Sequence, residues 1–136
     1  MTTLHDASHT EQSDPFAPLY PHKYLQLITY RKTGVGMPTP VGFGAQAGKI
    51  YIMTPGTASK LKRIRNNGRV TLAPCNRKGE VLGESVEGQA RILSPEERAV
   101  AQRAFISKYG TIYRIFLMLQ KMRKTQRSYI EIQPVQ

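Results

Sequence analysis

From Tyr24 onward, short segments of aliphatic and β-branched residues alternate with glycine-containing turns. Segments of this length and spacing are typical of antiparallel sheets and small barrels, and they argue against a fold of alternating strands and helices. Turns are predicted at residues 34–36, 46–48 and 78–79, the second of which should close a hairpin. We therefore expect a mainly β protein with helices, built as a six-stranded antiparallel barrel. The predicted strands cover residues 24–31, 40–45, 49–54, 69–76, 80–93 and 129–132.

Two helices are predicted before the last strand. Ser94 and Glu97 form a capping-box pattern, and Pro95 suits the first helical position, so a helix should begin here and end at Gly110. A second amphipathic helix is predicted over residues 112–123, with its apolar side packed on the barrel or on a partner subunit. A basic helix of this kind also binds membrane surfaces, which is the less favoured alternative. The residues expected to face inward are Ile115, Phe116, Leu119 and Met122.

A third, short helix is strongly basic. It follows a Pro-Gly turn, and Thr57 or Ser59 can cap its start by accepting hydrogen bonds from free backbone amides. Lys60 lies in the first turn, where acidic residues are usually preferred because the helix dipole is positive there. A cation at this position suits a bound anion, so the amides, a hydroxyl and the lysine together predict a phosphate site. The alternative is a solvated basic helix whose Leu61 and Ile64 face the core.

The formal net charge of +11 points to an anionic partner. Five basic residues and no acidic one occur between Lys60 and Arg69, and a second basic group lies near the C-terminus at Lys121, Arg123, Lys124 and Arg127. Nucleic acid is the generic partner of such a chain, and an anionic small molecule is the alternative. Barrels that bind single strands need exposed aromatic residues for stacking. The chain has no Trp and its aromatic residues do not gather near the basic ones, which makes nucleic acid the less favoured partner.

The length of 136 residues predicts one folded domain. Residues 1–18 are polar, lack periodicity and contain two prolines, so we expect a disordered or loosely packed tail before a domain over residues 19–136. His5 and His9 have a spacing of four, and His22 follows, but no carboxylate pattern supports a metal site, and none is predicted.

The composition also bears on the cellular location. No segment approaches the roughly 18 apolar residues of a membrane span, and no secretion signal is visible. Cys75 is the only cysteine and lies in a predicted strand with no histidine nearby in sequence, which argues against a catalytic thiol. We expect a cytoplasmic protein without membrane partners.

The order of several short motifs resembles the split β-barrel flavin and deazaflavin oxidoreductases, the pyridoxamine 5'-phosphate oxidase-like superfamily. Within it, the chain is most similar to the small branch of deazaflavin-dependent enzymes. The similarity covers about residues 24–132. The motifs are YLQLITYRK (24–32), TPVGF (39–43), IYIMT (50–54), SKLKRIRNN (59–67), VTLAPC (70–75), VEGQA (86–90) and KYG (108–110).

The resemblance implies a split barrel that forms a homodimer with the cofactor between subunits. It places backbone atoms of the Thr-Pro-Val segment beside the tricyclic ring and the cofactor phosphate near Thr54, Ser59 and Lys60. Gly42 stands where many family members have Trp, which could widen the pocket, and Met37-Pro38 stands where some have a basic residue. The predicted cofactor-binding residues are Thr39, Pro40, Val41, Thr54, Ser59, Lys60, Arg65 and Asn76.

The implied activity is hydride transfer between the cofactor and a small organic substrate, which the sequence leaves open. A deazaflavin or flavin carries the hydride itself, so the absence of a nucleophile motif is consistent with this chemistry. Coenzyme F-420 is favoured over FMN because it is more anionic and the helix is strongly basic. No catalytic residue is assigned, although Tyr109 and Tyr113 are candidate proton donors. The alternatives are a flavin-binding protein without turnover and a nucleic-acid-binding module.

Overall fold

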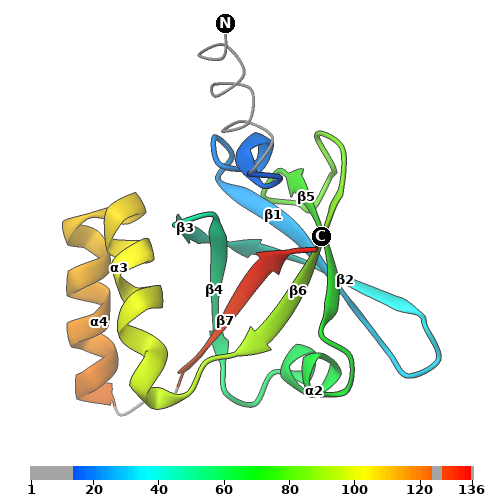
Figure 1. Cartoon of the computed structure of the whole chain (residues 1–136). Helices are drawn as coiled ribbons and strands as arrows, with labels where there is room; N and C mark the ends of the chain where they lie inside the picture. Colours follow the sequence, from blue (N-terminus) through cyan, green and yellow to red (C-terminus); the bar gives the residue numbers. More distant parts are fainter. Residues whose placement is uncertain (1–13, 124–126, 136) are drawn as a thin grey trace, which may run out of the picture.

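The computed structural model describes residues 14–123 and 127–135, and only the backbone of residues 120–123. Figure 1 shows its strands and helices along the chain. Short 3-10 helices are labelled η. In order, the elements are η1 (Ala17–Leu19), β1 (Tyr24–Tyr30), β2 (Gly36–Gly42), β3 (Gly44–Gln46), β4 (Lys49–Pro55), α2 (Ser59–Asn66), β5 (Arg69–Cys75), β6 (Val86–Ile92), η2 (Pro95–Glu97), α3 (Arg98–Tyr109), α4 (Thr111–Arg123) and β7 (Arg127–Pro134).

The strands form one strongly curled antiparallel sheet in the order β2-β1-β5-β6-β7-β4-β3 (Figure 1). The curl brings β2 near β4 without pairing them, so the barrel has a seam between these strands. The predicted mainly β split barrel is therefore confirmed. The β3–β4 hairpin is also confirmed, and its turn residues Ala47 and Gly48 both have positive φ, as the right-handed twist of a tight hairpin requires.

The expected number of strands was wrong by one, because the structure has seven. The single strand predicted over residues 40–45 is two strands, separated at Phe43. β2 begins at Gly36, where a turn was expected, and pairs with β1, whereas β3 pairs with β4. The chain thus changes its pairing partner at a buried residue, and the alternation of side chains does not show such a change.

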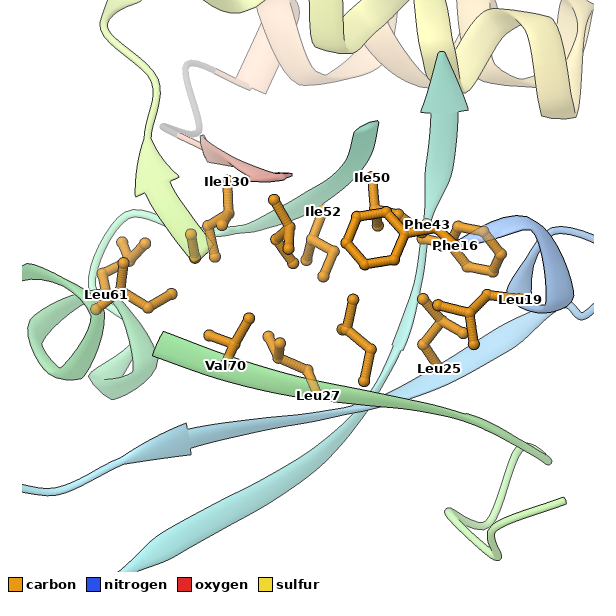
Figure 2. Packing of buried hydrophobic residues seen from close by; sticks show 14 residues of the cluster. Phe16, Leu19, Leu25, Leu27, Phe43, Ile50, Ile52, Leu61, Val70 and Ile130 are labelled. Atoms are coloured by element: carbon orange, nitrogen blue, oxygen red, sulfur yellow. The ribbon is translucent and has the colours of Figure 1, made fainter. Parts of the chain in front are cut away.

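The barrel interior is filled by aliphatic side chains with two phenylalanines. Figure 2 shows them pointing toward one another from β1, β4, β5, β7 and the segments before and between them. Leu61 and Ile64 of α2 belong to this cluster, so α2 closes one end of the barrel, as the sequence predicted for these two residues. Gly88 on β6 allows close packing, because an added Cβ would lie 2.6 Å from Ile132 Cγ2.

A second layer covers the outer side of β4 and β7. Helix α3 lies against β3, and an added Cβ at Gly44 would lie 2.9 Å from the Ala104 backbone carbon, which requires a glycine there. The capping box is confirmed: Ser94 N donates to Glu97 Oε1 at 2.9 Å, and the helix ends at Gly110 with φ +68°. The chain enters α3 through the 3-10 turn η2.

Helix α4 corrects another prediction. It packs beside α3 at the edge of the molecule (Figure 1) and reaches the sheet through Tyr113, whose hydroxyl bonds to that of Tyr129 on β7. Its outward side is exposed. Ile115 and Leu119, which were expected to face inward, are exposed, and Phe116 is partly buried as expected. Side-chain positions of Met122 and Lys121 lie outside the described residues. No helix in the described part of the chain is long and apolar enough to cross a membrane.

The structure also extends the packed domain toward the N-terminus. Phe16, which the sequence assigned to the loosely packed segment, is fully buried in the barrel together with Leu19 (Figure 2). That part of the prediction was wrong, because one large apolar side chain is enough to anchor a polar segment to an open barrel end. His5, His9 and Lys124 lie outside the described residues, and the proposed tail over residues 1–13 stays a prediction.

Candidate functional site

The start of helix α2 has no side-chain cap. The N-cap residue is Ala58, so the prediction that Thr57 or Ser59 caps the helix was wrong. The Pro55–Ala58 turn, in which Ala58 N donates to Pro55 O at 3.1 Å, sets where the helix begins. Ser59 is therefore the first helical residue, and its side chain is exposed. The first backbone amides of α2 remain available to an anion.

Lys60 lies in this first turn and is half-buried. Burial lowers the pKa of its ammonium group, and the nearby Arg63 lowers it further. No acidic side chain within the described residues forms an ion pair with Lys60. A half-buried cation beside a second cation is unfavourable unless an anion binds, so the electrostatics here favour an anionic ligand.

Thr54 is the last inward-facing residue of β4, on the same side as Ile50 and Ile52. It is 1% exposed, and its Oγ1 has no hydrogen-bond partner among the described residues. An unpartnered hydroxyl at a buried position costs free energy unless a ligand or water satisfies it. Only the Pro55–Ala58 turn separates Thr54 from the start of α2 in the chain.

Strand β2 carries the predicted ring-binding segment on the other side of the seam. Thr39 pairs with Leu27 and Val41 pairs with Leu25, so both side chains lie on the interior side of the barrel. Pro40 faces the opposite side. Because β2 lies near β4, the structure places Thr39 and Val41 on the same barrel face as Thr54. Their cofactor role stays a prediction.

Two of the predicted site residues lie elsewhere. Arg65 is exposed near the end of α2 and lines a shallow pocket with Gln89 and Arg91 of β6. Asn76 follows β5, whose seven residues span roughly 20 Å away from α2. The Asn76 side chain stabilises its own turn, accepting from Lys78 N at 3.0 Å and donating to Glu80 Oε1 at 2.7 Å. The structure therefore does not bring these two residues to Lys60.

The five basic side chains between Lys60 and Arg69 do not form one patch. Arg63 Nε donates to the buried Thr29 Oγ1 at 2.6 Å, which fixes it against β1. Arg69 pairs with Glu87 at 3.2 Å and lies over the ring of Tyr30. Among these five residues, only Lys60 combines partial burial with a position at the helix start, so it is the candidate for contact with an anion.

An aromatic cavity beside the seam was not predicted. Its volume is about 310 Å³, and it lies where β2, β4, α3 and α4 meet. Gly42 and Met53, two of its lining residues, directly adjoin Val41 and Thr54 in the chain. Tyr109 and Tyr113, considered as proton donors, both line it. The other lining residues are Phe105, Ile112 and Phe116. The sequence shows that Phe105 and Tyr109 are four residues apart and so share one face of a helix, which could have indicated an aromatic surface. Only the fold shows that Gly42 of β2 lies opposite them.

The tyrosine hydroxyls in this region are held in different ways. Tyr113 and Tyr129 share a hydrogen bond of 2.6 Å, and Tyr113 also contacts Met53 Sδ at 3.4 Å. Burial, followed by the bond to Tyr129, raises the pKa of Tyr113. The Tyr109 hydroxyl donates to Phe43 O over a longer distance of 3.4 Å, and burial raises its pKa. Both phenols are therefore protonated at neutral pH.

Residues 16–136 match the family model described as pyridoxamine 5'-phosphate oxidase. The chain belongs to the pyridoxamine 5'-phosphate oxidase family. This confirms the resemblance drawn from the motifs. The match covers the described barrel from the buried Phe16 to the last strand, β7. No curated protein of similar sequence was found.

Solved structures with the fold of this pyridoxamine 5'-phosphate oxidase family member differ in what they bind. A heme storage protein, HutZ from Vibrio cholerae, aligns with a TM-score of 0.64 and 15% identity over 86% of this chain and 84% of its own. An FAD-binding protein from Mesorhizobium loti aligns with a TM-score of 0.58 and 14% identity, covering 94% and 88%. An F420-H2 dependent reductase aligns with a TM-score of 0.58 and 16% identity, covering 82% and 94%. At these identities, the likeness is one of fold.

Proposed function

We propose that the protein is an oxidoreductase that binds a deazaflavin or flavin cofactor at the β2–β4 seam, with the cofactor phosphate at the start of α2. The observation that carries this proposal is the half-buried Lys60, which lacks an acidic partner within the described residues. It stands at an uncapped helix start, close in the chain to the unpartnered Thr54 hydroxyl. A phosphate would satisfy all three groups at once.

The family membership and the residues on the seam support this cofactor class. Lys60, the first amides of α2 and Thr54 would hold the phosphate, and the backbone of Thr39–Val41 would border the ring. When bound, the cofactor would supply the hydride chemistry with a small organic substrate. The chain would bind and orient it, exclude water, and hold a proton on the Tyr109 hydroxyl. Coenzyme F-420 is favoured over FMN because its longer anionic tail suits the exposed Lys62 and Arg65 beyond Lys60.

Replacement of Lys60 by Ala tests the phosphate site. Removing a charge-assisted hydrogen bond to a partly shielded anion should cost about 1.5–3 kcal/mol, which is roughly a ten- to hundredfold loss of cofactor affinity. Lys62→Ala is the matched control, because Lys62 carries the same charge on the same helix and is exposed. Both variants are titrated with F-420 and with FMN, following the cofactor's absorption and fluorescence. Equal small losses at the two positions would show that the basic helix is only a solvated surface.

The nucleic-acid alternative predicts a different result. The ion pair of Arg69 with Glu87 and the bond of Arg63 to Thr29 already engage two of the five cations on α2 and β5, which reduces the charge available to a phosphate backbone. If the surface nevertheless binds single strands, oligonucleotide affinity should fall by about 0.7 log units per phosphate contact for each decade of salt. Tight, salt-sensitive oligonucleotide binding without cofactor binding would replace the oxidoreductase proposal.

We also propose that the protein forms a homodimer through the outward side of α4. Ile115, Met118 and Leu119 are exposed there, and 64% of Met118 is accessible. Soluble monomers rarely expose such a row of large apolar side chains without a partner. Light scattering at micromolar concentration should give twice the chain mass of 15.3 kDa. Met118→Glu should shift the mass toward that of one chain, and a wild-type monomer would contradict the dimer.

A further inference from the structure

The described residues that line the aromatic cavity beside the seam carry no charge. They are Gly42, Met53, Ile112 and four aromatic side chains. A charged ligand would lose hydration against these apolar atoms. Two described cations near the lining, Lys108 and Arg127, already lie over the rings of Tyr109 and Phe116, at 5.6 Å and 5.8 Å from the ring centroids. The cavity therefore selects a neutral and largely apolar molecule.

The arrangement of the rings selects a flat shape. Phe105 stacks on Tyr109 with centroids 6.0 Å apart and an interplanar angle of 15°, and on Tyr113 at 5.0 Å and 17°. Phe116 continues the row beside Tyr113 at 5.6 Å and 29°. Within this row, Phe105 and Tyr113 each have a stacked neighbour on both sides, so a further aromatic ring contacts ring edges along the row or stacks on the ring at its end. A volume of about 310 Å³ is at the lower end of small-molecule sites, which suits a compact ring system.

One polar group in the cavity, the Tyr109 hydroxyl, is available to hydrogen-bond a ligand. The hydroxyls of Tyr113 and Tyr129 satisfy each other at 2.6 Å. The Tyr109 hydroxyl makes only a long bond of 3.4 Å to Phe43 O and belongs to a side chain that is 40% exposed. A ligand oxygen can replace that weak bond at little cost. The ligand is therefore expected to carry one hydrogen-bond acceptor at its edge.

We propose that this cavity is the substrate-binding site and that it takes neutral, flat aromatic compounds of one to two fused rings with an oxygen at the edge. The assignment as a substrate site rests on the proposed function, because Gly42 and Met53 place the cavity directly beside the proposed cofactor residues Val41 and Thr54. The ligand class itself rests only on the lining, the ring planes and the Tyr109 hydroxyl.

Binding of 2-naphthol to the full chain, with no cofactor added, tests the ligand class. Its own fluorescence anisotropy reports binding, and decahydro-2-naphthol, which has the same skeleton without flat rings, serves as the competitor. Stacking on one ring of the row should favour the flat compound by roughly two- to tenfold. Absence of 2-naphthol binding, or equal binding of the saturated compound, would overturn the proposal.

Two pairs of variants locate the binding. A Cβ at Gly42 would lie 3.3 Å from the Tyr109 hydroxyl, so Gly42→Trp places an indole in the cavity with only a small shift of an accessible side chain. It should abolish 2-naphthol binding, whereas Val81→Trp, at an exposed residue that does not line the cavity, should leave it unchanged. Ile112→Glu adds a carboxylate at the 76% exposed rim and should weaken binding, whereas Val81→Glu should not. Unchanged affinity in Gly42→Trp and Ile112→Glu would overturn the site.

Further measurements distinguish the aromatic site from the proposed cofactor site and from a contact between two copies of the chain. Tyr109→Phe should weaken 2-naphthol binding by roughly two- to tenfold, the worth of one ordinary hydrogen bond. Lys78→Ala should leave 2-naphthol binding unchanged, because Lys78 is exposed and does not line the cavity. If 2-naphthol binds as expected and neither cofactor binds, the oxidoreductase proposal fails while the aromatic site stands. A change of molecular mass in Gly42→Trp would identify a second copy of the chain as the occupant and overturn the proposal.

Discussion

Strands β4 and β7 separate two packed regions of very different character. Toward the barrel they present Ile50, Ile52, Ile130 and Ile132, and the interior these residues join is aliphatic and filled (Figure 2). Toward α3 and α4 they present aromatic and polar residues, including the buried Glu131. This outer region contains stacked rings, paired hydroxyls and a cavity. The comparison teaches that the barrel interior maintains the fold, whereas the outer layer has kept space and chemistry for a ligand.

The largest expected effect tests the inner region. Ile130 is fully buried in the barrel, and its replacement by Ala removes apolar surface and leaves a cavity in the packed interior. The free energy of unfolding should fall by about 2–5 kcal/mol. Urea denaturation followed by circular dichroism measures this value. If Ile130→Ala lowers the free energy of unfolding by less than Tyr129→Phe does, the barrel interior is not the more tightly packed region.

A smaller effect is expected one residue away, on the outer face of the same strand. Tyr129→Phe keeps the ring and removes the hydroxyl that bonds to Tyr113 at 2.6 Å. The Tyr113 hydroxyl keeps only its long contact to Met53 Sδ, so the free energy of unfolding should fall by about 1–3 kcal/mol. The same denaturation experiment applies. An unchanged stability would show that water replaces the lost partner and that the outer layer is wetter than its burial indicates.

The pH dependence of stability gives a third contrast. Burial, followed by the hydrogen bond to Glu131, raises the pKa of Tyr51 to about 12. Between pH 10 and 12, the folded protein keeps a proton that the unfolded chain has released, so the contribution of Tyr51 to stability falls as the pH rises through this window. Below pH 10, this contribution is fully present. Denaturation of wild type and Tyr51→Phe at several pH values should show the wild type losing stability relative to the variant only above pH 10.

The smallest effect is expected on the outward side of the outer layer. Ile115 is exposed on α4, so Ile115→Ala removes little buried surface within one chain. Its free energy of unfolding at concentrations where the chain is monomeric should change by no more than about 0.5 kcal/mol. A larger loss that grows with protein concentration would instead show that Ile115 is buried in the proposed dimer.

Much of the inner region could be predicted from local patterns. The alternation along β1, the Ala47-Gly48 turn and the Ser94–Glu97 capping box each depend on residues close in sequence, and all are confirmed. The alternation predicted over residues 80–93 is confirmed only for Val86–Ile92, the extent of β6. The motif order also indicated the family, which the match over residues 16–136 confirms. These features are set by backbone conformations and hydrogen bonds that a few neighbouring residues determine.

The candidate site was predicted less completely. Thr54, Ser59 and Lys60 lie around one turn of the chain, and Thr39 and Val41 share the barrel face of Thr54. Their binding role stays a prediction. Arg65 and Asn76 were included for their residue type and motif position, but α2 and β5 carry them away from Lys60. The apolar side of α4 was expected on the barrel or on a partner subunit, because periodicity shows that a helix has an apolar side without showing what covers it. Ile115 and Leu119 are exposed and not packed on the barrel, and the partner-subunit alternative stays a prediction.

The sequence by itself therefore determined that most of the strands and all three α-helices exist and in what order, together with the basic start of α2 and the family, but not every boundary. Only the tertiary structure decided that residues 36–46 form two strands with different partners, that Phe16 enters the barrel, and that Gly42 and Met53 meet the rings of α3 and α4. The physical reason is the range of the interactions. Caps and turns involve residues a few positions apart. A pairing partner or a cavity instead depends on segments that can lie more than half a chain apart, as Ile50 and Ile132 do, and these segments meet only because of how the whole sheet curls.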